Sequence, residues 1–325
     1  MTGVLLGFGV VAVIVAVGFA TSVLLPGQAG DIRRGLTPVV YYVTNPALMV
    51  VLVAGTDLRV VLGVYSPIAL ATAAVAGAVY VLVSGLILRR GAARTAVGAM
   101  ASSYVNAGNI GLPIALYAVG SSAPVVSVLL AQLLVVAPVY LLVFSWATRP
   151  RRATGPGATT AAPPRSDGRG STAGTIVRSV ANPVTVGTAV GALLSATGLR
   201  PPEVLWAPLE MLGEASIPLL LLLFGMSLHG QRPFRQRALV PDVLAGTAIK
   251  LAGMPAAAWL IGRLGFGLAG TELLGVVVMA ALPTAQNVFL FSSRFRMPAN
   301  AARDIIFLSS ILSFPAILLV SVLLG

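Results

Sequence analysis

Hydrophobic residues follow one another in runs of about 20 along most of the chain, and short polar gaps separate the runs. A helix of about 20 apolar residues spans a bilayer, because it rises about 1.5 Å per residue through a hydrocarbon core about 30 Å thick. The pattern predicts an all-α integral membrane protein with ten transmembrane helices. The predicted spans are residues 3–25, 35–55, 66–88, 95–118, 123–146, 175–197, 207–228, 240–262, 270–293 and 304–324.

Two of the predicted spans are interrupted near their centres by polar and helix-breaking residues. Span 4 contains NAGNIGLP, Asn106 to Pro113, and span 9 contains LPTAQN, Leu282 to Asn287. Backbone groups that lose their helical hydrogen bonds cost several kcal/mol each in hydrocarbon, so such segments persist only inside protein or beside water. Both breaks are therefore expected in the interior of the helix bundle.

The longest polar stretch, residues 148–174, is rich in Pro, Gly, Ser and Thr and predicts a disordered cytoplasmic linker. It separates two blocks of five spans, residues 1–147 and 175–325. An odd number of spans gives the blocks opposite orientations, and the interrupted spans occupy matching positions in them. The pattern predicts two inverted repeats, and matched interruptions of this kind point to a transporter's substrate site.

The distribution of charged residues predicts the orientation of the chain in the membrane. Only 9% of the residues are charged, and the net charge of +12 comes from arginines in the gaps between spans. The gaps after spans 1, 3, 5, 7 and 9, together with Arg178 at the start of span 6, hold 17 basic residues, and the other gaps hold three. The excess of basic residues in cytoplasmic loops places both termini outside the cell and explains the charge without a nucleic-acid partner. The chain has no Cys and one His, so we expect no metal, no cofactor and no enzymatic activity.

The two breaks predict a site for a small organic anion. The second half-helices should begin near Ile110 to Pro113 and near Asn287, with their N-termini facing each other. Free N–H groups and the positive end of the helix dipole attract a carboxylate there. The predicted substrate-binding residues are Asn106, Asn109, Gln132, Lys250, Gln286 and Asn287, and the predicted crossing or hinge residues are Gly108, Gly111, Pro113 and Pro283.

Three polar residues within spans each have two possible roles. A charge at the position of Lys250, in the middle of span 8, costs at least about 2.5 kcal/mol, so Lys250 either balances the substrate charge or is a static partner that joins helices. Glu214 in span 7 either carries a coupling ion or is also a static partner. Gln132 in span 5 either faces the site or bonds to a neighbouring backbone.

In this order and spacing, the motifs resemble the auxin efflux carrier family, which includes plant auxin exporters and bacterial dicarboxylate permeases. VNAGNIGLPIALYAVG resembles the family's span-4 crossing, LPTAQNVFLFSSRF its span-9 crossing, and VANPVTVGTAVG its Asn-Pro opening of span 6. Single positions also fit the pattern: Gln132, Glu214 before Gly225, and Lys250 before Pro255.

The resemblance implies an inverted-repeat fold like that of the bile acid symporters. Spans 1, 2, 6 and 7 would form a scaffold, expected to make a homodimer. Spans 3–5 and 8–10 would form a transport domain that moves in elevator fashion. Asn106 would match the family's substrate-site asparagine, and Pro113 and Pro283 its crossing prolines. Met49 stands where plant members place a hydroxyl, so the resemblance does not imply auxin itself.

The sequence therefore predicts a secondary transporter of organic anions in the cell membrane, with H⁺ or Na⁺ as a possible coupling ion. Two other classes fit less directly. A sodium-coupled symporter of the bile acid type would use the half-helix C-termini and amides to bind Na⁺, and sodium dependence of uptake would identify it. A membrane enzyme or sensor is disfavoured, because no span holds a close carboxylate pair and no soluble domain is predicted.

Overall fold

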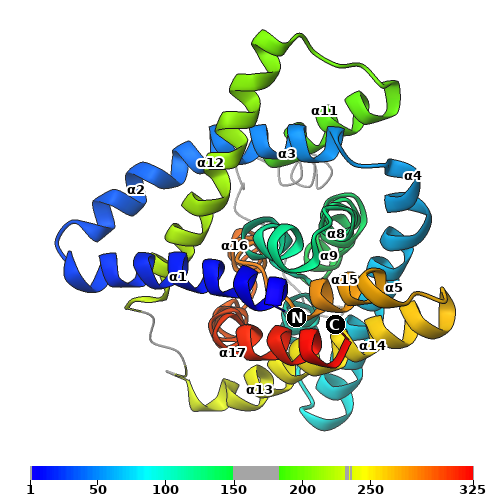
Figure 1. Cartoon of the computed structure of the whole chain (residues 1–325). Coiled ribbons are helices and arrows are strands. Elements are labelled where there is room, and N and C mark those ends of the chain that lie inside the picture. Colours follow the sequence, from blue (N-terminus) through cyan, green and yellow to red (C-terminus); the bar gives the residue numbers. More distant parts are fainter. Residues whose placement is uncertain (1, 149–182, 231–233, 235, 325) are drawn as a thin grey trace, which may run out of the picture.

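The computed structural model describes residues 2–148, 183–230, 234 and 236–324, and this part of the chain is built from helices (Figure 1). Within it, six helices are long and apolar enough to cross a membrane, and shorter apolar helices cover Gly9–Leu24, Pro183–Thr197 and Gly270–Ala281. The protein is therefore an all-helical, multi-pass membrane protein, as predicted. The predicted linker lies outside the described residues except for Thr148.

In the first half, helices occupy each predicted span, some as several consecutive elements. Spans 2 and 3 begin earlier than predicted, at Ala29 and Leu58. The Asp57 carboxylate fixes the second start, because it accepts a hydrogen bond from the Arg59 N–H at 2.8 Å as a helix N-cap. The elements are α1 Thr2–Leu24, α2 Ala29–Val39, η1 Val40–Thr44, α3 Asn45–Ala54, α4 Leu58–Val60, η2 Val61–Tyr65, α5 Ser66–Leu82, η3 Val83–Ile87, α6 Ala92–Ser103, η4 Ala107–Gly111, α7 Leu112–Ile114, η5 Ala115–Val119, α8 Ala123–Ala131, η6 Gln132–Val136 and α9 Ala137–Ala147.

The second half follows the predicted spans in the same way from Pro183 onward. Its one interrupted span is divided into α15 and α16. The elements are α11 Pro183–Thr197, α12 Glu203–Leu228, η7 Arg237–Leu239, α13 Val240–Ala248, η8 Ile249–Gly253, α14 Met254–Leu260, η9 Ile261–Gly265, α15 Gly270–Ala281, α16 Asn287–Arg294 and α17 Asn300–Leu324.

Proline positions explain several of the changes in helix type. Five π-helical turns, η1, η2, η4, η6 and η8, each end two residues before a proline. Proline lacks an N–H, and its ring clashes with the carbonyl one turn earlier. A widened turn relieves this clash while the helix continues. The spans that contain η1, η2, η6 and η8 are therefore irregular without being broken, whereas η4 follows the break in span 4.

The helices pack in two groups. In the first packing group, α12 lies against α1 and α3, and α11 lies along α3 (Figure 1). Glycine permits the close approach: a Cβ at Gly191 of α11 would lie 2.7 Å from the Val50 carbonyl oxygen of α3. Small residues at helix contacts are typical of membrane proteins.

The second packing group contains α5, α6, α8, α9, α13, α14, α15 and α17. At one end an ion pair joins two of its segments: Arg90 lies 2.9 Å from Asp242, whose side chain is almost fully buried. The two packing groups meet where α1 and α12 contact η4, α7 and η5. One of the interrupted spans therefore lies at the interface between the groups.

Candidate functional site

The two interrupted spans cross in direct contact. Between α6 and η4, and between α15 and α16, the chain is unwound, and Val105 pairs with Thr284 in an isolated antiparallel bridge. The Asn106 N–H donates to the Pro283 carbonyl at 2.8 Å, and the Ala285 N–H donates to the Tyr104 carbonyl at 3.2 Å. We call the unwound segments, residues 104–106 and 282–286, the crossing.

The structure corrects one predicted helix start next to the crossing and confirms the other. The second half-helix of span 4 begins at Ala107, three residues before the predicted start, whereas that of span 9 begins at Asn287 as predicted. Asn106 accounts for the earlier start, because its side-chain oxygen accepts from the Asn109 N–H at 3.4 Å and caps the π turn. Pro113 consequently lies within the second half-helix, at the start of α7, and not in the unwound segment.

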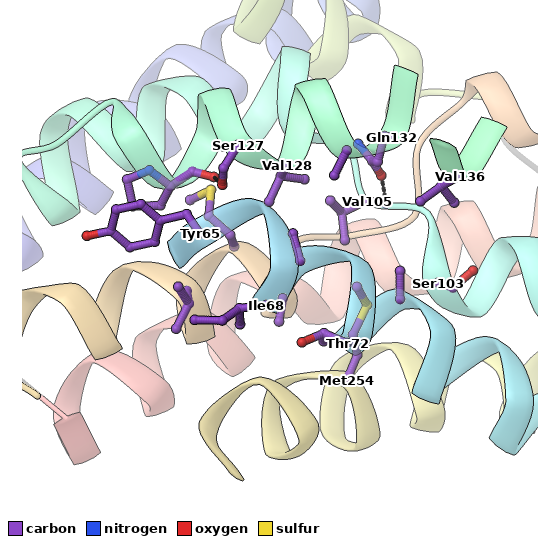
Figure 2. A pocket seen from close by; sticks show the side chains of 17 residues that line it. Tyr65, Ile68, Thr72, Ser103, Val105, Ser127, Val128, Gln132, Val136 and Met254 are labelled. Carbon is purple, nitrogen blue, oxygen red and sulfur yellow. Dashed lines mark hydrogen bonds between the residues drawn. The ribbon is translucent and has the colours of Figure 1, made fainter. Parts of the chain in front are cut away.

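Side chains from neighbouring helices satisfy the bridged residues. The Val105 N–H donates to Gln132 Oε1 at 2.6 Å, a contact visible in Figure 2. The Thr284 N–H donates to Ser309 Oγ of α17 at 3.1 Å. Of the two readings of Gln132, the bond to backbone is therefore observed, although Gln132 also reaches the cavity described below. An unpaired buried N–H would cost about 1–3 kcal/mol, so both acceptors hold the crossing in place.

The helix ends before the crossing are also capped. The Thr284 hydroxyl donates to the Ala101 carbonyl at 2.6 Å, and Lys250 Nζ donates to the Ala280 carbonyl at 2.7 Å. Ala101 and Ala280 each lie four residues before a bridged residue. Lys250 is fully buried and does not line the cavity. The structure thus places Lys250 on the backbone beside the crossing, and not among the groups that a substrate in the cavity would touch.

A cavity of about 770 Å³, the main cavity, begins at the crossing. The predicted residues Asn106, Gly108, Asn109, Gln132, Gln286 and Asn287 all line it. Its wall, within the described residues, includes three arginines and no Asp or Glu, and six aromatic side chains offer apolar contact area. The arginines are Arg33, Arg294 and Arg303, and the aromatic residues are Tyr41, Tyr104, Phe224, Phe289, Phe291 and Phe307.

Free donors face the main cavity at the crossing. Within the described part of the chain, the backbone N–H groups of Gly108, Gln286 and Asn287 have no hydrogen-bond partner, and all three residues line the cavity. Gln286 and Asn287 form the N-terminus of α16, whose Gln286 side chain makes no capping hydrogen bond. Unpaired N–H groups and the positive end of a helix dipole suit an anion. The lining therefore favours an organic anion with one polar end and an apolar body.

The two predicted hinge glycines differ in their surroundings. A Cβ at Gly111 would lie 2.6 Å from Leu282 Cδ1, whereas a Cβ at Gly108 would have its nearest neighbour, Leu129 Cδ2, at 3.9 Å. Gly111 is therefore required by the close approach of the two spans. Gly108 leaves space that belongs to the main cavity.

Glu214 lies elsewhere. It is exposed on α12 and does not line the main cavity. The geometry therefore does not support contact between Glu214 and the substrate.

Two residues at the main cavity were missed from the sequence. The Tyr104 side chain lies close to that of Asn287 and packs edge-on against Phe291, with ring centroids 6.4 Å apart. Asn45 is buried, lines the main cavity, and its Oδ1 atom has no partner among the described residues. The Asn45-Pro46 pair was a usable signal, since span 6 opens with the same pair, but Asn182 lies outside the described residues.

A second, small cavity, which we call the rear cavity, is lined by residues of both halves of the chain (Figure 2). Val105 and Gln132 line both cavities, so they form part of the wall between them. The rear cavity measures about 30 Å³, enough for about two water molecules. Thr72 lines it, with a buried hydroxyl that has no partner in the described chain.

Comparison with known proteins gives one match. A family model described as "Membrane transport protein" matches residues 10–321, a range that includes both halves of the crossing. No curated protein matches the chain.

Proposed function

The chain belongs to the auxin efflux carrier family of membrane transport proteins, and from this premise we propose that it is a secondary transporter of small organic anions. The observation that carries the proposal is the crossing at the end of the main cavity, where three unpaired N–H groups face a wall with arginines and without carboxylates. Dicarboxylates and auxin-like acids are the candidate substrates.

In this proposal the carboxylate binds at the N-terminus of α16 and beside Asn106. The Asn106 side chain uses its oxygen to cap η4, so its NH₂ group remains available to a ligand in the main cavity. A hydrogen bond to a charged group contributes about 1.5–3 kcal/mol. The aromatic side chains near the crossing, Tyr104 and Phe291, would contact the organic body of the substrate.

Alternating access would follow from movement of the second packing group, which carries the crossing, against the first. Support comes from the packing: most contacts lie within each group, and those between the groups are made chiefly by α1 and α12 against η4, α7 and η5. The second packing group would then be the transport domain of an inverted-repeat elevator, and the first packing group would be its scaffold. Arg33, Arg294 and Arg303 line the main cavity, and the positive-inside rule assigns the helix ends that carry them to the cytoplasmic side. The described state is therefore assigned as inward-facing, with both termini outside the cell membrane.

Orientation and assembly have direct tests. The chain has no cysteine, so Ser171→Cys introduces a single label site in the linker. It should stay unlabelled by an impermeant thiol reagent in intact cells, and labelling from outside would reverse the assigned topology. We also expect a homodimer through the first packing group. Light scattering of the purified protein would measure twice the chain mass of 33.1 kDa after subtraction of detergent.

Transport is tested in proteoliposomes. Purified protein is first screened by thermal shift against dicarboxylates and aromatic monocarboxylates, and the hits are then offered as radiolabelled substrates. We expect saturable uptake that unlabelled carboxylate inhibits and that protein-free liposomes lack. Absence of uptake and binding for every organic anion tested would contradict the proposal.

A further inference from the structure

Asn45 is a buried amide in the part of the main-cavity wall that the first packing group provides. It is the first residue of α3, and its exposed fraction is 6%. Among the described residues that line the main cavity, Asn45 alone has a buried side-chain atom, Oδ1, without a hydrogen-bond partner. A buried polar group without a partner is unfavourable. The wall therefore holds an unused hydrogen-bonding group beside the space in which we place the substrate.

Asn45 ends a stripe of polar and aromatic residues along this wall. Arg33, Thr37, Tyr41 and Asn45 all line the main cavity, and their spacing of four residues places them on one face of the helix formed by α2, η1 and α3. The Thr37 hydroxyl is already used, since it donates to the Arg33 carbonyl at 2.6 Å. At about 1.5 Å per residue, Asn45 lies roughly 18 Å along the helix from Arg33. The unused amide is therefore distant from the positive charge of its own stripe.

The chemistry of an amide side chain indicates what it can bind. It offers one acceptor oxygen and an NH₂ donor side by side. A carboxylate would use only the donor, and the Oδ1 atom would stay unpaired. A carboxamide, a hydroxyl group or a protonated carboxyl group both donates and accepts, so it can satisfy both atoms. Asn45 therefore suits a neutral polar group better than a second negative charge.

We propose that Asn45 is a specificity-determining contact, which binds a neutral hydrogen-bonding group at the end of the substrate opposite its carboxylate. The inference rests on the proposed function, because it takes the carboxylate to be bound at the crossing. It narrows the substrate class to small monoanions with a carboxamide or hydroxyl group at the far end. A dicarboxylate would have to bind with its far carboxyl group protonated.

This placement lets the substrate touch both packing groups. Asn45 belongs to α3 in the first packing group, and the crossing is carried by the second. The main cavity measures about 770 Å³ and is lined by both, a volume typical of sites that hold drug-sized ligands. The contact with Asn45 would therefore be made in the described state and broken when the second packing group moves.

Three compounds with the same arrangement of non-hydrogen atoms test the inference. Succinamate, succinate and 4-methylpentanoate each carry one carboxylate, and their far ends are a carboxamide, a second carboxylate and an isopropyl group. Glutaramate, glutarate and 5-methylhexanoate repeat the comparison with one more methylene group. Each compound is titrated calorimetrically into the purified full chain at the same neutral pH and salt concentration.

Two variants separate the contact from a structural role. Asn45→Leu replaces the amide by an apolar side chain of similar shape. Thr44→Val is the matched control, because the Thr44 hydroxyl is also buried without a partner among the described residues, yet Thr44 does not line the main cavity. Each variant removes an unsatisfied buried group, so without ligand each should melt at least as high as wild type.

We expect wild type to bind the carboxamide about ten-fold more tightly than the isopropyl compound of the same length, the size expected for one or two hydrogen bonds. It should also bind the carboxamide more tightly than the dicarboxylate. In Asn45→Leu the isopropyl compound should bind more tightly than the carboxamide. Thr44→Val should keep the wild-type order.

Three results would overturn the inference. They are an unchanged order of affinities in Asn45→Leu, a dicarboxylate that wild type binds most tightly at both lengths, and an Asn45→Leu protein that melts several degrees lower without ligand. In each case the proposed function stands as long as the anions bind. If none of the six compounds binds to wild type but another carboxylate does, this inference alone fails. If no carboxylate binds at all, the proposed function fails with it.

Discussion

The two halves of the crossing share a backbone arrangement but differ in chemistry. In each half an unwound residue is bridged to the other half, a neighbouring helix accepts its N–H, and a side chain caps the preceding helix end. In span 4 the second half-helix is capped by Asn106, and Asn106 and Ala107 are buried. In span 9 it begins with exposed Gln286 and Asn287, whose N–H groups are free in the described chain.

This difference suggests a division of roles. The span-4 half contributes a side chain, Asn106, and a tightly packed backbone. The span-9 half contributes backbone donors, with the Lys250 side chain on the carbonyl of the preceding helix end. A site for a symmetric ion would need only one of these two arrangements of donors, present in both halves of the crossing. The asymmetry fits a ligand with two unlike ends, and the following predictions test whether the halves differ as described.

The largest effect is expected from filling the contact between the halves. Gly111→Leu would push against Leu282, which is fully buried, and against Val125, so the added side chain overfills this contact. Overpacking of this kind costs about 1–3 kcal/mol and occasionally more. We expect a strongly lowered melting temperature and loss of uptake. Gly108→Ala is the control and should melt as wild type, because its added methyl group meets nothing closer than 3.9 Å. Equal stability of the two variants would contradict the close crossing.

The next effect concerns ligand affinity. Asn106→Ala removes a side-chain partner of the carboxylate, and the loss of about 1.5–3 kcal/mol lowers affinity roughly ten- to a hundred-fold. Asn106→Leu should be worse, since it also fills the cavity. Asn287→Ala should have a smaller effect, because the donors of α16 are backbone groups that the substitution retains. Isothermal titration with an identified substrate measures all three, and a larger loss for Asn287→Ala would reverse the assigned roles.

The next prediction concerns the stability that two side chains provide by accepting backbone N–H groups at the crossing. Gln132→Leu leaves the Val105 N–H without its partner, and Ser309→Ala does the same to the Thr284 N–H. Each should cost about 1–3 kcal/mol, measured as a drop in melting temperature. Gln132→Glu retains an acceptor, so it should lose less stability than Gln132→Leu, yet bind an anion more weakly because its charge lies at the main cavity. Unchanged anion affinity in Gln132→Glu would separate Gln132 from the site.

The smallest effect is expected at the arginine-lined end of the main cavity. Arg33→Gln in α2 and Arg294→Gln in α16 remove exposed charges that line the main cavity. Their attraction for an anion is long-range and screened by salt. The Michaelis constant should rise a few-fold at low ionic strength, and the difference should disappear at about 0.5 M salt. A difference that persists at high salt would indicate direct contact with the substrate.

Sequence patterns were sufficient for the helical spans and for the two breaks, because hydrophobic run length and helix-breaking residues are local properties. The start of α16 at Asn287 was predicted from Pro283 and the polar residues after it. The earlier start of η4 was not, because it depends on the hydrogen bond between the Asn106 side chain and Asn109. From the residue type alone, an asparagine that caps a helix cannot be distinguished from an asparagine that contacts a ligand.

Side-chain direction was the other limit. Lys250 was expected at the site or at a static partner, and only the position of α15 shows that its partner is a carbonyl beside the crossing. Glu214 fits the family's spacing, yet it is exposed on α12 and does not line the main cavity, and the sequence alone does not show which way its side chain points. Tyr104 reads as an ordinary apolar residue in the sequence, and its contact with Asn287 exists only once the two breaks are brought together.

The central claim is that the crossing binds negative charge, and the most direct measurement compares one carboxylate with its own primary amide. Both are titrated into purified wild-type protein at the same pH and salt concentration. The amide keeps the shape of the substrate and loses its charge. Because hydrogen bonds to a charged group are worth about 1.5–3 kcal/mol, we expect the amide to bind roughly ten- to a hundred-fold more weakly. Equal affinity for the acid and the amide would show that the crossing is a structural feature only and that the anion binds elsewhere.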